Sequence, residues 1–405
     1  MFNIYVAHEP QGEPRVSLIP KHVKALIQMG YSVSIETQAG LLSGYIDEDY
    51  EKVGASIVPE QDDARRLARG KAQLLCRLQK PEIKDLDGFS KGCIHLSFLD
   101  PFFSPDLLKE LARRGFEALS LEMIPRSTIA QKMDVLSSQA SLAGYAAVLQ
   151  AASRLPKVFP MMMTPSGNIS PARVFIIGVG VAGLQAIATA KRLGARVEAF
   201  DTRPQVEEQV RSLGARFVQI DLGETGESSG GYAKELSAEQ LAKQQEAQAR
   251  VCAQSDIVIT TAKVFGRKSP RLIPESVLAQ MKPGSIVIDL AVAGGGNVEG
   301  SVNGEEVVTP NGVRILGLDQ AERLVAKDAS DMLSGNIFAF IEHFTLQETV
   351  PDASQASAAP NSPDTSQTNT APQKCVHLNL STSDPIIESC RITQNGQIVH
   401  PKFQA

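Results

Sequence analysis

Val174-Phe175-Ile176-Ile177-Gly178-Val179-Gly180-Val181-Ala182-Gly183 is the stretch of this chain that decides its fold. Four apolar residues typical of a buried strand run directly into a Gly-x-Gly-x-x-Gly pattern, and a helical pattern follows from Leu184 to Leu193. A strand, a glycine turn and a helix in this order are typical of a dinucleotide-binding βαβ unit. Gly178 permits the tight turn, Gly180 lets the backbone approach a pyrophosphate, and Gly183 allows close packing of helix on strand. The N–H groups and positive dipole of the helix N-terminus then face the phosphates.

The preferred nucleotide is indicated by Asp201, which lies 18 residues after Gly183 at the end of the next expected strand, Val197 to Phe200. A carboxylate there can accept hydrogen bonds from both hydroxyls of an adenosine ribose and would repel a 2′-phosphate, so the sequence favours NAD over NADP. Arg203 could neutralise such a phosphate, but a solvent-facing position at the start of the next helix is the favoured interpretation. FAD, an S-adenosyl cofactor and a purely structural glycine turn are the alternatives to NAD.

Strands and helices alternate on both sides of this unit, which predicts an α/β fold of two Rossmann-like, doubly wound, parallel-sheet domains with a cleft between them. The expected domains are residues 1–135, with a helix over 325–350 packing back on them, and residues 136–324, which hold the nucleotide. Residues 351–373 contain no large apolar or basic side chain and are predicted to be a flexible linker. Residues 374–405 are expected to form a β-hairpin tail with a turn at Asn395-Gly396.

Four local patterns predict where elements begin and end. Ser104-Pro105 is expected to be the N-cap and first residue of a helix, and Ser237-x-x-Gln240 is a capping box. Phe217 to Ile220 is predicted to be a strand, and Thr164-Pro165-Ser166-Gly167 a loop.

The composition favours work on a small molecule. The chain has 405 residues, a net charge of -5 and 21% charged residues, which argues against a nucleic-acid or membrane-surface partner. The five cysteines include no Cys-x-x-Cys pair and the histidines form no ligand-like pair, so we expect no metal site, no disulfide framework and a cytoplasmic location. Val174 to Ala190 carries no charge, but its glycines favour a buried strand and helix over a membrane span.

Further segments share the pattern of one family. They are Glu13-Pro14-Arg15-Val16, Phe200-Asp201-Thr202-Arg203-Pro204, Gly231-Tyr232-Ala233-Lys234, Thr260-Thr261-Ala262, Gly266-Arg267, Asp289-Leu290-Ala291, Gly295-Gly296-Asn297 and Gln397-Ile398-Val399-His400-Pro401. The most specific element is Arg126-x4-Gln131-x2-Asp134-x2-Ser137. With the glycine turn, these segments resemble the NAD(H)-binding component of proton-translocating nicotinamide nucleotide transhydrogenase, in the form where that component is a separate subunit. The resemblance covers nearly the whole chain outside residues 351–373.

The resemblance implies a catalytic set, Arg126, Gln131, Asp134 and Ser137. In that family the arginine, aspartate and serine hold the nicotinamide end of NAD, and the glutamine reaches toward the partner nucleotide. The implied nucleotide-binding residues are Arg126, Ser127, Thr128, Ile129, Gln131, Asp134, Ser137, Ser138, Gly178, Gly180, Val181, Ala182, Gly183, Asp201, Thr202, Arg203, Gly231, Tyr232, Thr261, Ala262, Lys263 and Gly266. Gly230, Gly231 and Tyr232 resemble a mobile loop that closes over the nucleotide. From the residues alone, Asp134, Ser137 and Ser138 could instead cap the helix that follows.

The implied activity is hydride transfer from NADH on this chain to NADP on a partner subunit, while a membrane-spanning subunit couples the transfer to proton translocation. The resemblance also implies a homodimer, attached to the inner face of the membrane through its partner subunits. The sequence contains one glycine fingerprint, so we expect this chain to bind NAD(H) and to need the NADP-binding subunit for activity.

Two other functions are considered. Alanine dehydrogenase has a similar fold and shares Arg15, but its Lys-x-Lys-Glu-Pro motif is replaced by Arg77-Leu78-Gln79-Lys80-Pro81, its histidine falls near Asp100, and its aspartate falls at Ala293. A non-catalytic NAD-binding module would not need the Arg126 to Ser137 segment. The chain departs from the transhydrogenase pattern at Asp319-Gln320-Ala321-Glu322, where the family usually has a proline, and at Gly294, where it usually has a side chain.

Overall fold

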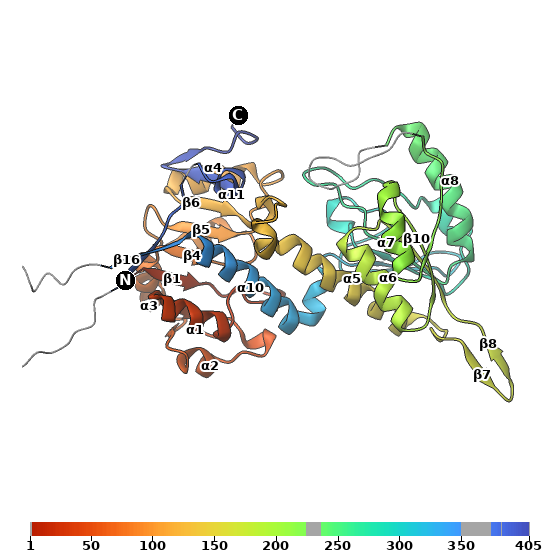
Figure 1. Cartoon of the computed structure of the whole chain (residues 1–405), viewed down its shortest axis with the longest axis horizontal. Helices are drawn as coiled ribbons and strands as arrows, with labels where there is room; N and C mark the ends of the chain where they lie inside the picture. Colours follow the sequence, from red (N-terminus) through yellow and green to blue (C-terminus); the bar gives the residue numbers. More distant parts are fainter. Residues whose placement is uncertain (1, 224–235, 350–373, 382, 405) are drawn as a thin grey trace, which may run out of the picture. The chain divides into compact units, whose positions relative to one another are not determined.

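The computed structural model describes residues 2–223, 236–349, 374–381 and 383–404. The chain forms two compact units (Figure 1), and each is described by itself. Unit 1 comprises Met1–Val135 and Ser330–Ala405, and unit 2 comprises Leu136–Ala329. Unit 1 is therefore built from both ends of the chain.

Unit 1 contains an eight-stranded sheet in the order β19-β18-β6-β5-β4-β1-β2-β3. Its strands are β1 (Asn3–Val6), β2 (Ser32–Glu36), β3 (Ser56–Val58), β4 (Leu74–Cys76), β5 (Ile94–Ser97), β6 (Glu117–Ser120), β18 (Arg391–Gln394) and β19 (Gln397–Ile398). Its helices are α1 (Pro20–Met29), α2 (Asp47–Glu51), α3 (Asp62–Lys71), α4 (Pro105–Arg114), α11 (Pro385–Cys390) and most of α10 (Ala326–Phe344). Strands β1 to β6 are parallel, and their order 3-2-1-4-5-6 is that of a doubly wound nucleotide-binding sheet.

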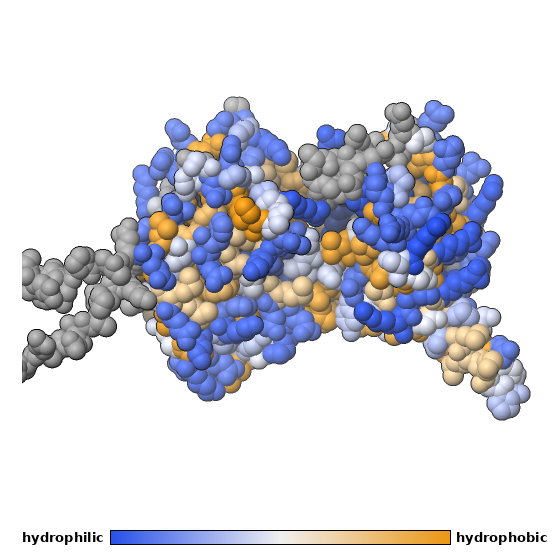
Figure 2. Space-filling view, in the orientation of Figure 1, coloured by the Kyte–Doolittle hydropathy of each residue, from blue (hydrophilic) through white to orange (hydrophobic). Residues whose placement is uncertain are grey.

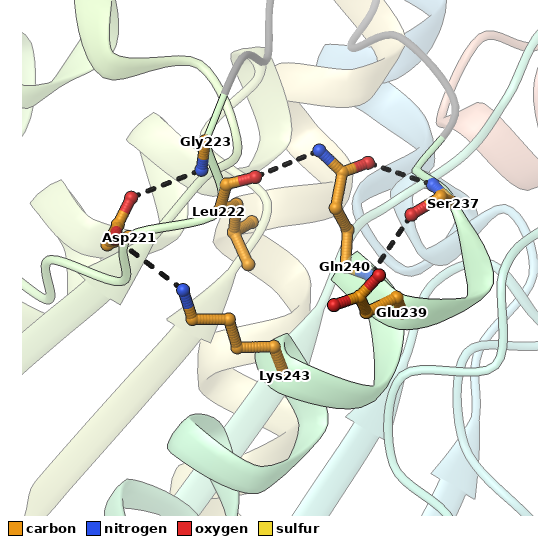
Figure 3. A pocket seen from close by; sticks show the side chains of 7 residues that line it. All are labelled: Asp221, Leu222, Gly223, Ser237, Glu239, Gln240 and Lys243. Atoms are coloured by element: carbon orange, nitrogen blue, oxygen red, sulfur yellow. Dashed lines mark hydrogen bonds and ion pairs between the residues drawn. The ribbon is translucent and has the colours of Figure 1, made fainter.

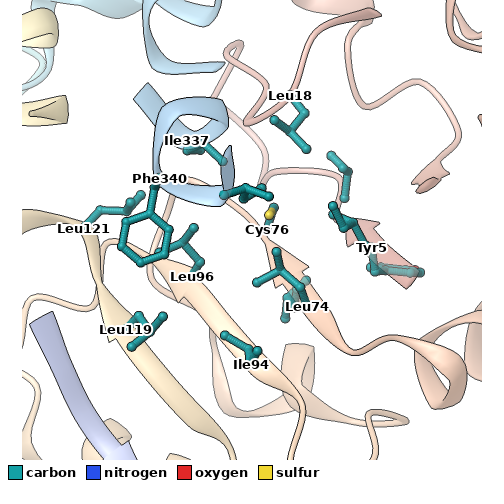
Figure 4. Close-up of a cluster of buried hydrophobic side chains, with 14 of the residues drawn as sticks. Tyr5, Leu18, Leu74, Cys76, Ile94, Leu96, Leu119, Leu121, Ile337 and Phe340 are labelled. Atoms are coloured by element: carbon teal, nitrogen blue, oxygen red, sulfur yellow. The ribbon is translucent and has the colours of Figure 1, made fainter. Parts of the chain in front are cut away.

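Helix α10 supplies part of the core of unit 1. Its side chains Leu333, Ile337, Phe340 and Ile341 are fully buried. In Figure 4, Ile337 and Phe340 lie over Leu96 and the strands beside it. Burying a side chain of this kind contributes roughly 1.5–3 kcal/mol, so the return of the chain after unit 2 is a large part of what holds unit 1 together.

The end of the chain joins the same sheet. Strand β18 pairs antiparallel with β6, and β19 pairs with β18 across a turn in which Asn395 and Gly396 both have positive φ, as the expected hairpin requires. The side-chain hydroxyl of Thr393 donates to the carbonyl of Phe116 at 2.8 Å and accepts from the N–H of Ala118 at 3.2 Å. The Arg391 guanidinium pairs with a carboxylate of β6 at 2.7 Å. A further strand pair, β16 (Thr345–Thr349) with β17 (Lys374–Leu378), is antiparallel.

Unit 2 contains a seven-stranded sheet in the order β11-β10-β9-β12-β13-β15-β14, parallel except for β14. Its strands are β9 (Arg173–Ile177), β10 (Arg196–Phe200), β11 (Arg216–Phe217), β12 (Ile257–Thr260), β13 (Ile286–Asp289), β14 (Glu306–Val308) and β15 (Arg314–Gly317). Its helices are α5 (Val135–Arg154), α6 (Val181–Arg192), α7 (Glu207–Ser212), α8 (Ala238–Gln254) and α9 (Glu275–Leu278). The order reverses between β9 and β12, and ligands bind at the carboxyl ends of the strands at such a point.

Some local expectations were right and others wrong. The capping box is confirmed, because the Ser237 hydroxyl accepts from the N–H of Gln240 and the Gln240 side chain accepts from the N–H of Ser237. Ser104 is the N-cap residue of α4, but its hydroxyl accepts from Lys80 at 2.9 Å and caps no backbone N–H. The strand expected to reach Ile220 is shorter and ends at Phe217.

The segment expected to be a loop at 164–167 is the turn of a hairpin. Strands β7 (Met162–Thr164) and β8 (Gly167–Ile169) pair antiparallel and form a two-stranded arm on unit 2 (Figure 1). The arm carries apolar surface (Figure 2), and no residue from Val158 to Ala172 is charged. Met163, for example, is 76% exposed.

Candidate functional site: the nucleotide-binding turn of unit 2

The glycine turn connects β9 to α6 at the point where the strand order reverses. Gly178 has φ of +95°, a conformation that L side chains rarely adopt, and Gly180 is the N-cap of α6. A Cβ at Gly183 would lie 2.0 Å from the carbonyl oxygen of Gly178, whereas a Cβ at Gly180 would meet no atom within 4 Å. The turn thus needs glycine at 178 and 183 for its own packing, while the space beside Gly180 stays open for a ligand. Val181 and Ala182 begin the helix, and the N–H groups of a first turn lack partners within the helix.

Asp201 follows β10 and is buried against the turn. One carboxylate oxygen, Oδ2, accepts from the backbone N–H of Val179 at 2.7 Å, which ties the carboxylate to the glycine turn. The neighbouring Thr202 is partly buried.

The expectation that Arg203 faces solvent is wrong. Its side chain is 11% exposed and its Nε and Nη2 atoms donate to the two oxygens of Asp201, each at 2.9 Å. Nη2 also donates to the carbonyl of Val179 at 3.2 Å. The guanidinium folds back because a buried carboxylate beside it offers a bidentate acceptor, which residue spacing alone does not reveal.

The loop after β12 lies beside the glycine turn. The Thr261 hydroxyl donates to the carbonyl of Gly178 at 2.9 Å, and the N–H of Thr261 donates to the last residue of β9, Ile177. The N–H of Lys263 donates to the carbonyl of Thr261 at 2.9 Å, and Gly266 has positive φ. The structure therefore brings Thr261 together with the glycine turn.

Two buried residues that were quoted in the sequence without a role hold this loop in place. Asn297 is fully buried: its side chain accepts from the N–H of Ala262 at 3.1 Å and donates to the carbonyls of Ala262 and Pro270. Asp289, also fully buried, accepts from the N–H groups of Asn297 and Ala291 at 3.0 and 2.9 Å. A saturated network of buried polar groups fixes the loops after β12 and β13 to one another.

The two departures from the family pattern lie in the loops after β13 and β15. A Cβ at Gly294 would come 2.7 Å from the hydroxyl of Ser269, so this position accepts a side chain only if Ser269 moves. Gln320 has φ of +51°, in the left-handed region that few non-glycine residues adopt.

In unit 1, the segment that carries Arg126, Gln131 and Asp134 is anchored by apolar side chains and exposes polar ones. Ala130 and Met133 are buried in the core, and the carbonyl of Lys132 accepts from the Asn336 side chain of α10 at 2.8 Å. Arg126 Nε lies 3.8 Å from Asp134 Oδ2, so these two predicted site residues lie together. The exposed residues of the segment are Arg126, Ser127, Thr128, Ile129 and Gln131.

Ser137 and Ser138 lie in the first turns of α5, and both are partly buried. Farther along the helix, a Cβ at Gly144 would lie 2.1 Å from the carbonyl oxygen of Ala182. Helix α5 therefore packs in close contact with the start of α6, and glycine at position 144 permits that contact.

Gly231 and Tyr232, with Gly230, lie outside the described residues. The residues on either side of that gap line a shallow polar pocket (Figure 3). There Gln240 donates to the carbonyl of Leu222 at 2.9 Å and accepts from the N–H of Ser237 at 2.9 Å. This single side chain holds the chain on both sides of residues 224–235.

Unit 1 repeats the strand order of unit 2, but its reversal point is filled by its own side chains. Between β1 and β4, the buried carboxylate of Glu9 accepts from the N–H groups of Leu78 and Gln79 at 2.5 and 3.0 Å, and burial raises the pKa of Glu9 to about 7. Arg15 is 1% exposed and forms two 2.7 Å hydrogen bonds to Glu13. Among the described residues, no group of three or more histidine, cysteine or acidic side chains is placed to hold a metal ion.

Comparison with known proteins gives matches over nearly the whole chain. Residues 5–143 match the family model described as "Alanine dehydrogenase/PNT, N-terminal domain", and residues 147–362 match its C-terminal domain. A separately encoded first portion of NAD(P) transhydrogenase subunit alpha from Rickettsia prowazekii is 39% identical, with 84% of this chain and 88% of that protein covered. The Rhodospirillum rubrum protein of the same name is 37% identical, with 96% and 95% covered. A crystal structure of transhydrogenase from Sinorhizobium meliloti superposes with a TM-score of 0.82 at 35% identity, over 98% of this chain and 100% of that one.

Alanine dehydrogenases match less well. The Bacillus subtilis enzyme is 29% identical, with 71% of this chain and 69% of the enzyme covered. Both the glycine turn of unit 2 and the filled reversal point of unit 1 thus lie within matched domains. The chain belongs to the alanine dehydrogenase/PNT family and is most similar, among these relatives, to NAD(P) transhydrogenase alpha subunits.

Proposed function

We propose that this chain is the NAD(H)-binding subunit of a proton-translocating NAD(P) transhydrogenase. The observation that carries the proposal is the open space beside Gly180 at the N-terminus of α6, with the buried carboxylate of Asp201 beside it, in a chain that matches transhydrogenase alpha subunits over most of its length. Bound NADH would supply the hydride, which is accepted by NADP⁺ on a partner subunit to give NAD⁺ and NADPH.

The residues of unit 2 fit a dinucleotide. The first turn of α6 would bind the pyrophosphate through N–H groups and the helix dipole. Asp201 would accept hydrogen bonds from the adenosine ribose, and the loop of Thr261 to Gly266 would lie along the nucleotide. At the nicotinamide end, we assign Arg126, Asp134, Ser137 and Ser138 to binding, and Gln131 to positioning the ring toward the partner nucleotide.

The proposal includes partners. A second subunit would hold NADP(H), and a membrane-spanning subunit would couple hydride transfer to proton movement and place this chain at the inner face of the membrane. Within the described part of this chain, no helix is long and apolar enough to cross a membrane. We also assign a homodimer.

The side chains of unit 1 argue against alanine dehydrogenation. Glu13 takes both ends of the Arg15 guanidinium, and the ammonium of Lys80 pairs with Asp100 at 2.9 Å, so these cations already have carboxylate partners within the chain. Ala293 has no side chain that could exchange a proton. A keto acid would lack both a carboxylate-binding cation and a proton donor.

We therefore expect no NADH formation from L-alanine and NAD⁺ between neutral and alkaline pH. The measurement is absorbance at the NADH wavelength with the purified full chain, and a known alanine dehydrogenase serves as the positive control. Turnover of about 1 per second or faster, within the usual range of enzymes, would contradict the transhydrogenase assignment.

The full chain should bind NADH at least about 10-fold more tightly than NADPH, because the 2′-phosphate would meet the carboxylate of Asp201 and lose the hydrogen bonds that a ribose hydroxyl makes there. Isothermal titration calorimetry of both nucleotides checks this. Asp201→Asn removes the charge and keeps the shape, so it should reduce the preference to within a few-fold. Equal affinity of the parent chain for both nucleotides would remove Asp201 from the recognition of the ribose.

A further inference from the structure

The carboxylate of Asp201 has all of its acceptor positions occupied. Oδ1 accepts from the backbone N–H and the Nε of Arg203, both at 2.9 Å. Oδ2 accepts from the N–H of Val179 at 2.7 Å and from Nη2 of Arg203 at 2.9 Å. A carboxylate offers about four lone-pair positions, so the two hydroxyls of an adenosine ribose find none open.

Of these four donors, two can leave. The N–H groups of Val179 and Arg203 belong to the backbone, and Val179 lies inside the glycine turn, whose path is fixed by the contact of Gly183 with Gly178. The Arg203 guanidinium is at the end of a long side chain with several rotatable bonds. When it leaves, one backbone donor remains on each oxygen, which keeps the carboxylate in the same orientation.

We propose that Arg203 is a specificity-determining residue of the nucleotide site, because its guanidinium occupies the two acceptor positions of Asp201 that the adenosine ribose takes. This inference rests on the proposed NAD(H) site. The guanidinium competes with the ribose hydroxyls of NADH, and NADH binding displaces it. For NADPH its effect is opposite, because the displaced cation lies beside the 2′-phosphate and offsets the negative charge of Asp201. Arg203 therefore narrows the preference for NADH that Asp201 creates.

The test is Arg203→Met in the full chain, with the dissociation constants of NADH and NADPH measured by calorimetry. The expected result is NADH binding that is about 3- to 30-fold tighter, since a bidentate charge-assisted pair no longer has to be broken, and NADPH binding that is about 3-fold or more weaker. Opposite shifts separate this role from a structural one, because a loss of local order would weaken both nucleotides together.

Arg216→Met is the matched control. Its guanidinium also pairs with a carboxylate of unit 2, Glu198 at 3.2 Å, but the side chain is 72% exposed and belongs to β11. Both affinities should stay within about twofold of the parent. Arg203→Lys keeps the charge but not the bidentate geometry, so NADH should bind more tightly by a smaller factor and NADPH should bind as in the parent.

NADH affinity that is unchanged or weaker in Arg203→Met would overturn the role of Arg203. If that variant does not fold, Arg203→Lys decides by the same criterion. A parent chain that binds neither nucleotide would overturn the proposed function itself, and with it this inference.

Discussion

Replacing Gln131 by asparagine should slow hydride transfer to NADP⁺ by about 10- to 1000-fold while the affinity for NADH stays within about threefold of the parent. The two nicotinamide rings must be held about 3–3.5 Å apart, and a misplacement of about 1 Å can cost on the order of 100-fold in rate. Gln131 is exposed on a segment whose neighbours Ala130 and Met133 are buried, so the shorter side chain should change the reach of one group and not the fold of the loop.

Stopped-flow measurement of NADPH formation in the reconstituted complex, at saturating NADH, is the appropriate experiment. Gln280→Asn, at an exposed position where the side chain donates to the carbonyl of Ser276, is a control of the same chemical change and should keep the parent rate. Arg126→Ala should lower both rate and affinity, because a charged contact to the nucleotide is lost as well. A parent rate in Gln131→Asn would take this residue out of the mechanism.

Alanine at the two glycines of the turn should separate folding from binding. Gly183→Ala places a methyl group 2.0 Å from a backbone oxygen, so we expect a loss of about 3 kcal/mol of unfolding free energy, a fall of about 6–12 °C in the unfolding midpoint, and loss of NADH binding. Gly180→Ala meets no protein atom within 4 Å and has φ of −84°, so its midpoint should equal that of the parent.

The affinity of Gly180→Ala for NADH should nevertheless fall by about 10- to 100-fold, because the methyl group takes the space through which the backbone approaches a pyrophosphate. Differential scanning calorimetry and isothermal titration calorimetry give the two quantities for each variant. Parent-like NADH binding by Gly180→Ala would mean that the phosphates lie elsewhere, and an unchanged midpoint for Gly183→Ala would contradict the close packing of α6 on the turn.

Much of the fold could be predicted from the sequence because its signals are local. The apolar strand, glycine turn and helix at 174–193 are contiguous, and the capping box at Ser237 and Gln240 is complete within four residues. The turn at Asn395-Gly396 needs only two residues with positive φ. Such patterns specify backbone conformation without any knowledge of distant partners.

What could not be predicted depends on distant partners. The pairing of β18 with β6 joins residues more than 270 positions apart, such as Thr393 and Ala118, and no spacing rule reports it. The side chain of Arg203 was expected in solvent because its acceptor is buried only after β10 meets the glycine turn. Asn297 and Asp289 form a network that is visible only once two loops are side by side.

The candidate site is divided in the same way. Gly178, Gly180, Gly183 and Asp201 follow from the physical needs of a dinucleotide, whereas Arg126, Gln131 and Ser137 were identified through resemblance. No local rule distinguishes an exposed arginine or glutamine that touches a nucleotide from one that faces water. Their roles remain predictions, and the Gln131 experiment addresses them directly.

The construction of unit 1 from both ends of the chain has a consequence for biosynthesis. The ribosome releases β6 early, but the strand that covers its edge, β18, emerges about 270 residues later, which at about 5–20 residues per second is on the order of 15–50 s. During this interval unit 2 can fold, while the nascent sheet of unit 1 lacks α10 and exposes the hydrogen-bonding edge of β6. An uncovered edge strand can pair with another chain. Translation speed and chaperone supply should therefore determine the yield of folded protein.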